Sequence, residues 1–183
     1  MTLLTTVFLF QQRQFDSTTL LRSLAYSVAL SVREAQTYGT SIRAFGGGFG
    51  AEAYGIYVNI NSPGTYILFA DDNDNGQYDT SPTNELVNTF TFSSNYAITD
   101  ICALYQGSQN ECASTNFIDW LAITFRRPNP DACIETDLRQ DLCDASPVAD
   151  YSQGYIRIRG PSGTTRSVTV TPTGQIAVGP VGS

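Results

Sequence analysis

The first part of the chain carries apolar residues at steps of three and four positions. The stripe consists of Leu20, Leu21, Leu24, Val28, Val32 and Ala35. Charged residues lie off this stripe, so residues 3–38 are predicted to form one long helix with a single apolar face. Gly39 is suited to end the helix, and the capping residues Asp16 and Ser17 allow a break or restart near them.

Further along, apolar and polar residues alternate, which is typical of half-buried strands. The predicted strands are 54–60, 65–70, 86–92, 96–104, 117–125, 154–160, 166–171 and 175–179. The turn sequences NSPG (61–64) and GPSG (160–163) predict hairpins. In the last hairpin Ile156, Ile158, Val168 and Val170 are expected to point inward, and Arg157, Arg159 and Arg166 outward. Residues 126–153 are interpreted as a long loop closed by its own disulfide.

These patterns predict an α+β fold in which a long N-terminal helix packs on an antiparallel β-sheet domain. The helix is assigned to residues 1–39 and the β domain, with two disulfide-closed loops, to residues 40–183. The glycine-rich stretch 45–50 is expected to link the two parts flexibly. The length of 183 residues suits one domain of this size.

The composition argues against an enzyme. The chain contains neither His nor Lys, so the commonest general bases and amine nucleophiles are missing. Its formal net charge of −7 disfavours nucleic acid and anionic membranes as partners, because affinity for phosphate comes mainly from clusters of Lys and Arg.

The four cysteines form two pairs, each separated by ten positions. They are Cys102, Cys112, Cys133 and Cys143. Zinc ligands usually stand two to four residues apart, so two disulfides are favoured over metal ligation and over free buried thiols. Local pairing, Cys102 with Cys112 and Cys133 with Cys143, is predicted because each bond would close one short loop. Disulfides indicate an oxidising compartment.

The sequence DDNDNGQYD, residues 71–79, spaces oxygen-bearing side chains as a calcium-binding loop does. The candidate ligands are Asp71, Asn73, Asn75, the Gln77 carbonyl and Asp79. Alternate side chains converge in such a loop while a glycine, here Gly76, permits the sharp turn. Position twelve is Pro82 rather than a bidentate Glu, and Glu85 is a candidate substitute. A polar turn rich in Asp and Asn that holds no ion is the alternative.

The opening sequence MTLLTTVFLF is apolar but only about half as long as a membrane-spanning helix of about 20 residues. It lacks the basic region and the cleavage site of a secretory signal. A chain that looks oxidised but carries no export signal is expected to have lost its true N-terminus.

The stretch from Val7 to Arg43, the sequence TFRRPNPDA and the closing SVTVTPTGQIAV together resemble type IV pilins and type II secretion pseudopilins, in particular the GspH/FimT-like minor pseudopilins. A REAQ run near the end of the helix is part of this resemblance. The leader, the Gly before the cleavage site and the early Glu of prepilins are missing. We therefore expect that roughly 10 to 20 anchor residues are absent, and that residues 1–15 are the truncated anchor part.

The resemblance implies a structural subunit that is anchored in the inner membrane and then assembles, through its helix, into a periplasmic or extracellular filament. Its partners would be other pilin or pseudopilin subunits. The residues expected to pack against neighbouring helices are Leu3, Leu4, Val7, Phe8 and Phe10. Leu20 to Ala35 are expected to cover the β domain of the same molecule. The alternative is a minor pilin that binds DNA or another extracellular ligand through its β domain.

Overall fold

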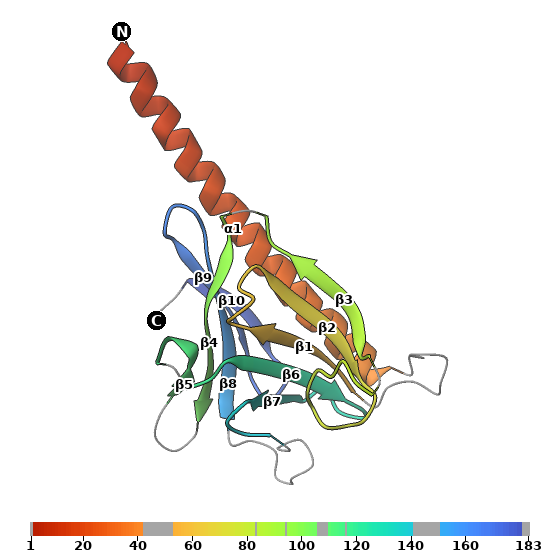
Figure 1. Cartoon of the computed structure of the whole chain (residues 1–183). Helices are drawn as coiled ribbons and strands as arrows, with labels where there is room; N and C mark the ends of the chain where they lie inside the picture. The colour runs from red at the N-terminus through yellow and green to blue at the C-terminus, as the bar shows by residue number, and fades with distance from the viewer. Residues whose placement is uncertain are drawn as a thin grey trace.

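The computed structural model describes residues 2–41, 53–82, 84–93, 95–105, 110–115, 117–140 and 151–180, with side chains from residue 17 onward. Helix α1 (Thr2–Thr40) is continuous through Asp16 and Ser17. Its C-terminal half lies against the β strands, and its N-terminal half runs out beyond them (Figure 1).

In the described residues, ten strands form two antiparallel sheets of five strands each. The first sheet has the order β3 (Leu86–Thr91), β2 (Thr65–Asp71), β1 (Ala53–Asn59), β6 (Trp120–Arg126) and β7 (Ala132–Thr136). The second has the order β10 (Ile176–Pro180), β9 (Thr165–Val170), β8 (Tyr151–Arg159), β4 (Ala97–Tyr105) and β5 (Asn110–Cys112). A short 3-10 turn, η1 (Ala113–Thr115), follows β5.

The predicted fold class is wrong. The described part of the chain is mostly β, with one helix beside two separate sheets, rather than a long helix packed on a sheet. Alternation along a strand tells which side chains face the core but not which strands are neighbours, so one sheet and two facing sheets have the same pattern. Strand β7 also lies inside the segment predicted to be a loop, and the three-residue β5 was not predicted.

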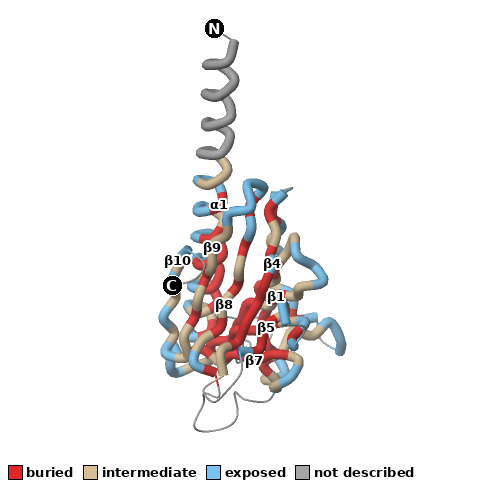
Figure 2. The backbone as a smooth tube through the Cα atoms, turned by 90° about the vertical axis from the view of Figure 1, so that its left-hand side faces the viewer, coloured by how far each residue is buried: buried red, intermediate tan, exposed pale blue. Residues whose placement is uncertain are grey.

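One core fills the space between the sheets and α1. Buried backbone is concentrated there in Figure 2. The helix contributes Leu21, Ala25, Val28, Ala29, Val32 and Ala35 to this core. It packs against β1 and β6 of the first sheet and against β9 and β10 of the second. Most of the apolar stripe read from the sequence therefore serves the molecule's own core, but Leu20, which was predicted to belong to it, is 56 % exposed.

Two contacts show how closely α1 is built into the β strands. A Cβ on Gly39 would lie 2.1 Å from the carbonyl oxygen of Phe125, so only glycine allows this approach to β6. Gln36 Nε2 donates hydrogen bonds to the carbonyl oxygens of Pro130, at 3.0 Å, and Gly174, at 3.1 Å. These two carbonyls belong to loops of different sheets, so one helix side chain ties both sheets together.

Candidate functional site

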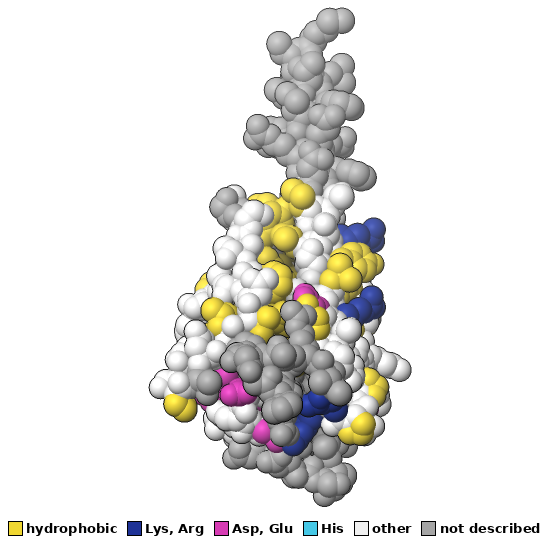
Figure 3. Space-filling view, turned by 90° about the vertical axis from the view of Figure 1, so that its right-hand side faces the viewer, with side chains coloured by type: hydrophobic (Ala, Val, Ile, Leu, Met, Phe, Trp, Pro, Cys, Tyr) yellow, Lys and Arg dark blue, Asp and Glu magenta, His cyan; other side chains and the backbone are white. Residues whose placement is uncertain are grey.

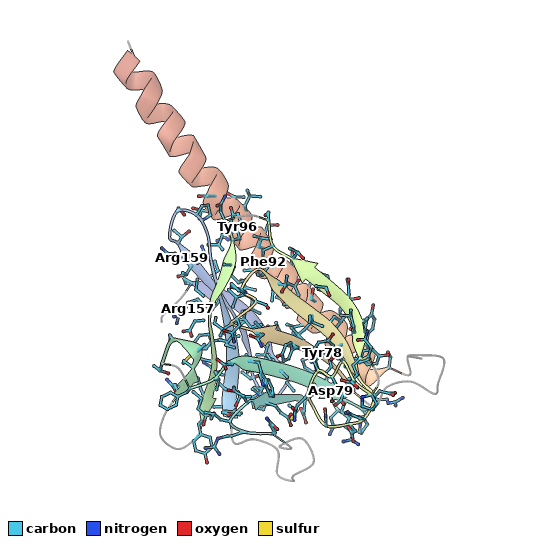
Figure 4. All side chains as sticks on the ribbon, viewed as in Figure 1. Tyr78, Asp79, Phe92, Tyr96, Arg157 and Arg159 are labelled. Carbon is cyan, nitrogen blue, oxygen red and sulfur yellow. A yellow bond between two sulfur atoms is a disulfide. The ribbon has the colours of Figure 1, made fainter. Side chains whose placement is uncertain are left out.

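The segment predicted to bind calcium connects β2 to β3 and lies over the outer face of the first sheet (Figures 1 and 4). Asp71 is the last residue of β2 and pairs with Ala53 of β1. Its side chain points to the outer face, because residues alternate along the strand and Leu68 and Ala70 belong to the core. The loop covers Asp71, which is only 1 % exposed.

The loop is wound around the Asp71 carboxylate. Asp71 Oδ1 accepts a hydrogen bond from the main-chain N–H of Asn75 at 3.0 Å, and Oδ2 accepts one from Gly76 at 2.8 Å. Asn73 Oδ1 accepts from the N–H of Asn75, and Asn75 Oδ1 accepts from that of Gln77. Gly76 has φ +74°, the left-handed conformation that glycine adopts without strain.

Hydrogen bonds link four of the residues predicted as ligands, namely Asp71, Asn73, Asn75 and Asp79. Asp79 Oδ2 lies 2.9 Å from Asn73 Nδ2 and 2.7 Å from Asn75 Nδ2. For Gln77 the predicted ligand is the main-chain carbonyl; its side chain donates from Nε2 to Gln140 Oε1 at 3.3 Å. The two asparagines present their amide nitrogens to Asp79, so a cation held there would require both amides to rotate and present oxygen instead.

Glu85 closes the loop from its far end. Its Oε1 accepts a hydrogen bond from the N–H of Asp72 at 3.1 Å, and its Oε2 accepts one from the N–H of Asp79 at 2.9 Å. The residue is fully buried. Burial raises the pKa of Glu85 to about 7 and that of Asp71 to about 6. Because both Glu85 oxygens bind main-chain donors, Glu85 acts here as a clamp on the loop.

Two further charged residues meet the loop from the first sheet. A Cβ on Gly76 would lie 2.5 Å from Oε2 of Glu135, a fully buried residue of β7. Arg126 of β6 forms an ion pair with Asp74 at 2.5 Å. Beside them lies a cleft of about 180 Å³ whose lining includes Asp71, Asp74 and Asp131. The sequence prediction missed Glu135 because β7 was taken for a loop.

The predicted disulfide between Cys102 and Cys112 is confirmed. These residues lie directly opposite each other on β4 and β5, with Cα atoms 4.1 Å apart. Asp100 lies close enough to both sulfurs for a metal-binding group, but sulfurs joined to each other are not thiolate ligands. Cys133 is also disulfide-bonded, and its predicted partner Cys143 lies outside the described residues.

The three arginines that were expected to point outward from the last hairpin do not share one face. Arg157 donates to the Asp100 carboxylate at 3.0 Å, and Asp100 is only 2 % exposed. Arg166 pairs with Ile158, so it stands in the inward row with Val168 and Val170. The predicted orientation of Arg166 is wrong because residues two apart on a strand share a face. Arg157 and Arg159 lie on the face of β8 that points away from the hydrophobic core (Figure 4).

A buried polar network that the sequence did not predict joins the two sheets. Glu111 of β5 accepts a hydrogen bond from Arg139 Nε at 3.0 Å and a very short one from the Tyr151 hydroxyl. The same hydroxyl lies 3.0 Å from Thr136 Oγ1. Arg139 also stacks 4.1 Å above the Tyr105 ring. The only feature of the sequence that could have pointed to this network is the position of Glu111 next to Cys112.

The side chains of Leu3, Leu4, Val7, Phe8 and Phe10 lie outside the described residues, although their backbone belongs to α1. Residues 45–50, the expected flexible link, also lie outside them. Within the described part of the chain, no helix combines the length and the apolar character needed to cross a bilayer. Comparison with protein-family models, with curated proteins and with solved structures gives no match.

Proposed function

We propose that this chain is a structural subunit, pilin-like or pseudopilin-like, that assembles through α1 into a filament of the type IV pilus or type II secretion kind. The observation that carries the proposal is the division of α1. About 39 residues at 1.5 Å each give a rod of about 58 Å. Its C-terminal half is built into the β core, and its N-terminal half extends past the strands (Figure 1).

The embedded half of α1 also presents apolar side chains to solvent. Leu20 is 56 % exposed, Tyr26 53 % and Leu30 61 %. Hydrophobic side chains gather below the projecting helix on the face seen in Figure 3. Tyr96 at the start of the second sheet donates a hydrogen bond to the Ser17 carbonyl at 3.2 Å, where α1 leaves the strands (Figure 4). A helix fixed at this point and apolar on its outer side suits packing against other subunits.

The proposed partners are other pilin or pseudopilin subunits, with inner-membrane anchoring before assembly and a periplasmic or extracellular filament afterwards. An enzymatic role is not part of the proposal, because the chain has no His and no Lys. The DNA-binding alternative is not favoured, since Arg157 is engaged by the buried Asp100.

The 71–79 loop is proposed as a calcium site within this subunit. Asp71, Asn73, Asn75 and Asp79 converge, and the residues are oxygen donors of the kind calcium prefers. With only two carboxylates among the candidate ligands, we expect weak affinity, on the order of 10⁻⁴ to 10⁻³ M, as in extracellular modules.

Self-association of the chain tests the filament proposal. We expect the wild-type chain to sediment as concentration-dependent oligomers, and a Leu4→Glu, Phe8→Glu double variant to remain monomeric. A Gln11→Glu, Gln12→Glu variant is the matched control, because it adds the same charge to the helix without removing apolar side chains. It should associate as the wild type does. A wild-type chain that stays monomeric at all concentrations, or two variants that behave alike, would contradict the proposal.

A further inference from the structure

Aromatic side chains form a row on the outer face of the first sheet. The ring centroids of Tyr57 and Trp120 are 5.8 Å apart, and those of Tyr57 and Tyr78 are 5.5 Å apart. Tyr57 and Trp120 come from neighbouring strands, where Asn59 pairs with Trp120 and Tyr57 pairs with Ala122. Tyr78 comes from the loop after β2 and rests on Phe69 at 5.9 Å. All three rings of the row are only partly buried.

Carboxylates stand beside this row. Asp137 Oδ1 accepts a hydrogen bond from the main-chain N–H of Asp119, the residue before Trp120, at 3.0 Å. This bond brings the turn after β7 to the start of β6. Burial is the main cause that raises the pKa of Tyr57, and the negative charges of Asp137 and Asp119 add to it. The hydrogen bond between Asp119 and Asp137 thus places both residues at the start of β6, next to Trp120.

Two exposed apolar residues belong to the same two segments. Phe117 is 44 % exposed and Leu138 53 % exposed. Elsewhere in the chain, two described aromatic rings with acidic neighbours hold an arginine: Arg139 stacks on Tyr105 beside Glu111, and Arg157 lies over Tyr155 beside Asp100. Among the described residues, no arginine lies over Tyr57, Tyr78 or Trp120.

We propose that the row of Tyr57, Tyr78 and Trp120, together with Asp119 and Asp137, is a docking surface for a guanidinium-bearing segment of a partner protein. Aromatic faces attract cations through their quadrupole, and Arg is the cation most often found there. The carboxylates supply the opposite charge, and a planar guanidinium donates to them while it stacks on a ring. The net charge of −7 favours a basic partner over an acidic one. This inference does not depend on the filament proposal.

Trp120 is the only tryptophan of the chain, so its fluorescence reports on this surface directly. The probe is N-acetyl-Arg-Gly-Arg-amide, and its matched control is the same peptide with citrulline, which has nearly the same shape but no charge. The arginine peptide should change the Trp120 emission in a saturable way and bind about five- to tenfold more tightly than the citrulline peptide. Added salt should reduce this difference.

Two variants separate this surface from general charge attraction. Asp137→Asn keeps an acceptor for the Asp119 N–H but removes the charge, and it should weaken arginine-peptide binding about threefold or more. Asp131→Asn removes the same charge from an exposed position on the β6–β7 connection and should leave binding unchanged. The proposal is overturned if the two peptides bind equally, if neither changes the emission, or if both variants weaken binding to the same extent.

Discussion

The carboxylate of Asp71 holds Gly76 by a hydrogen bond of 2.8 Å from the main-chain N–H of the glycine to Oδ2. The same glycine lies against the buried Glu135 of β7, a strand of the same sheet as Asp71. The loop thus turns at the one residue type that satisfies two demands at once. It needs a positive φ, and it needs a close approach to a side chain of β7.

Gly76→Ala should therefore destabilise the protein by about 2 kcal/mol or more, because a left-handed Ala is strained and its Cβ would meet the Glu135 carboxylate. Urea unfolding measures the loss. Gly64→Ala is the control, since a Cβ there meets nothing within 4 Å and its φ is not in the left-handed region. We expect Gly64→Ala to change the stability by less than about 1 kcal/mol. Equal losses would show that the turn at Gly76 is not constrained.

Calcium should raise the midpoint of thermal unfolding, and a chelator should return it to the starting value. At about 100 times the dissociation constant, binding to the folded state alone adds about 2.7 kcal/mol. Asp71→Ala should abolish the response. Asp79→Asn is a milder variant that keeps a hydrogen-bond acceptor and should weaken it. If calcium leaves the wild-type midpoint unmoved, the loop is only a polar turn between strands.

Without metal, the free energy of unfolding should fall as the pH rises from about 5 to about 8. The pKa values of Asp71 and Glu85 are raised by burial to about 6 and about 7, above the roughly 4 of unfolded chains. In that interval the folded state binds more protons than the unfolded state, so stability decreases with pH.

Urea unfolding in the presence of a chelator, at several pH values, checks this dependence. Glu85→Gln should flatten it, because the amide does not titrate. Asp119→Asn, which removes an exposed carboxylate outside residues 71–85, serves as the control. A stability that increases over the same interval would contradict the assignment of raised pKa values to these two residues.

The hydrogen bonds inside the 71–79 loop connect residues that are close in sequence, whereas the fold depends on contacts between distant segments. The spacing of Asp71, Asn73, Asn75 and Asp79 is local, and local hydrogen bonds decide where such short side chains go. Glu135 reaches the same loop across the sheet, from a strand far along the chain. No local sequence pattern predicts that contact, because it depends on the pairing of β6 with β7.

The hydrophobic pattern of the sequence likewise could not predict that the strands divide into two sheets. Tyr54, Ile56 and Val58 alternate inward on β1, and Ile156 and Ile158 do so on β8. Nothing in either pattern says that the two strands belong to different sheets. The orientation of Arg166 could have been predicted from the sequence. Alternation along β9 puts Arg166 in the same row as Val168 and Val170, but that rule was not applied.

The disulfide between Cys102 and Cys112 holds the edge strand β5 in place, and with it the hydrogen bonds of Glu111. Strand β5 has only three residues, and it is paired on one side, with β4. Closing a loop of about ten residues stabilises by about 2 to 3 kcal/mol in the chain-entropy model. Glu111 stands beside Cys112 and reaches Arg139 and Tyr151, so loss of the bond should also loosen the link between the sheets.

Replacing Cys102 and Cys112 together by Ala should therefore cost more than the chain-entropy value of about 3 kcal/mol. Glu111→Gln alone measures the part due to the network, and adding it to the cysteine variant tests whether the two losses are coupled. Coupling is expected, because β5 positions the carboxylate. Strictly additive losses would show that β5 keeps its place without the disulfide. Non-reducing peptide mapping should first recover Cys102 linked to Cys112 and Cys133 linked to Cys143, and crossed pairs would contradict the local pairing.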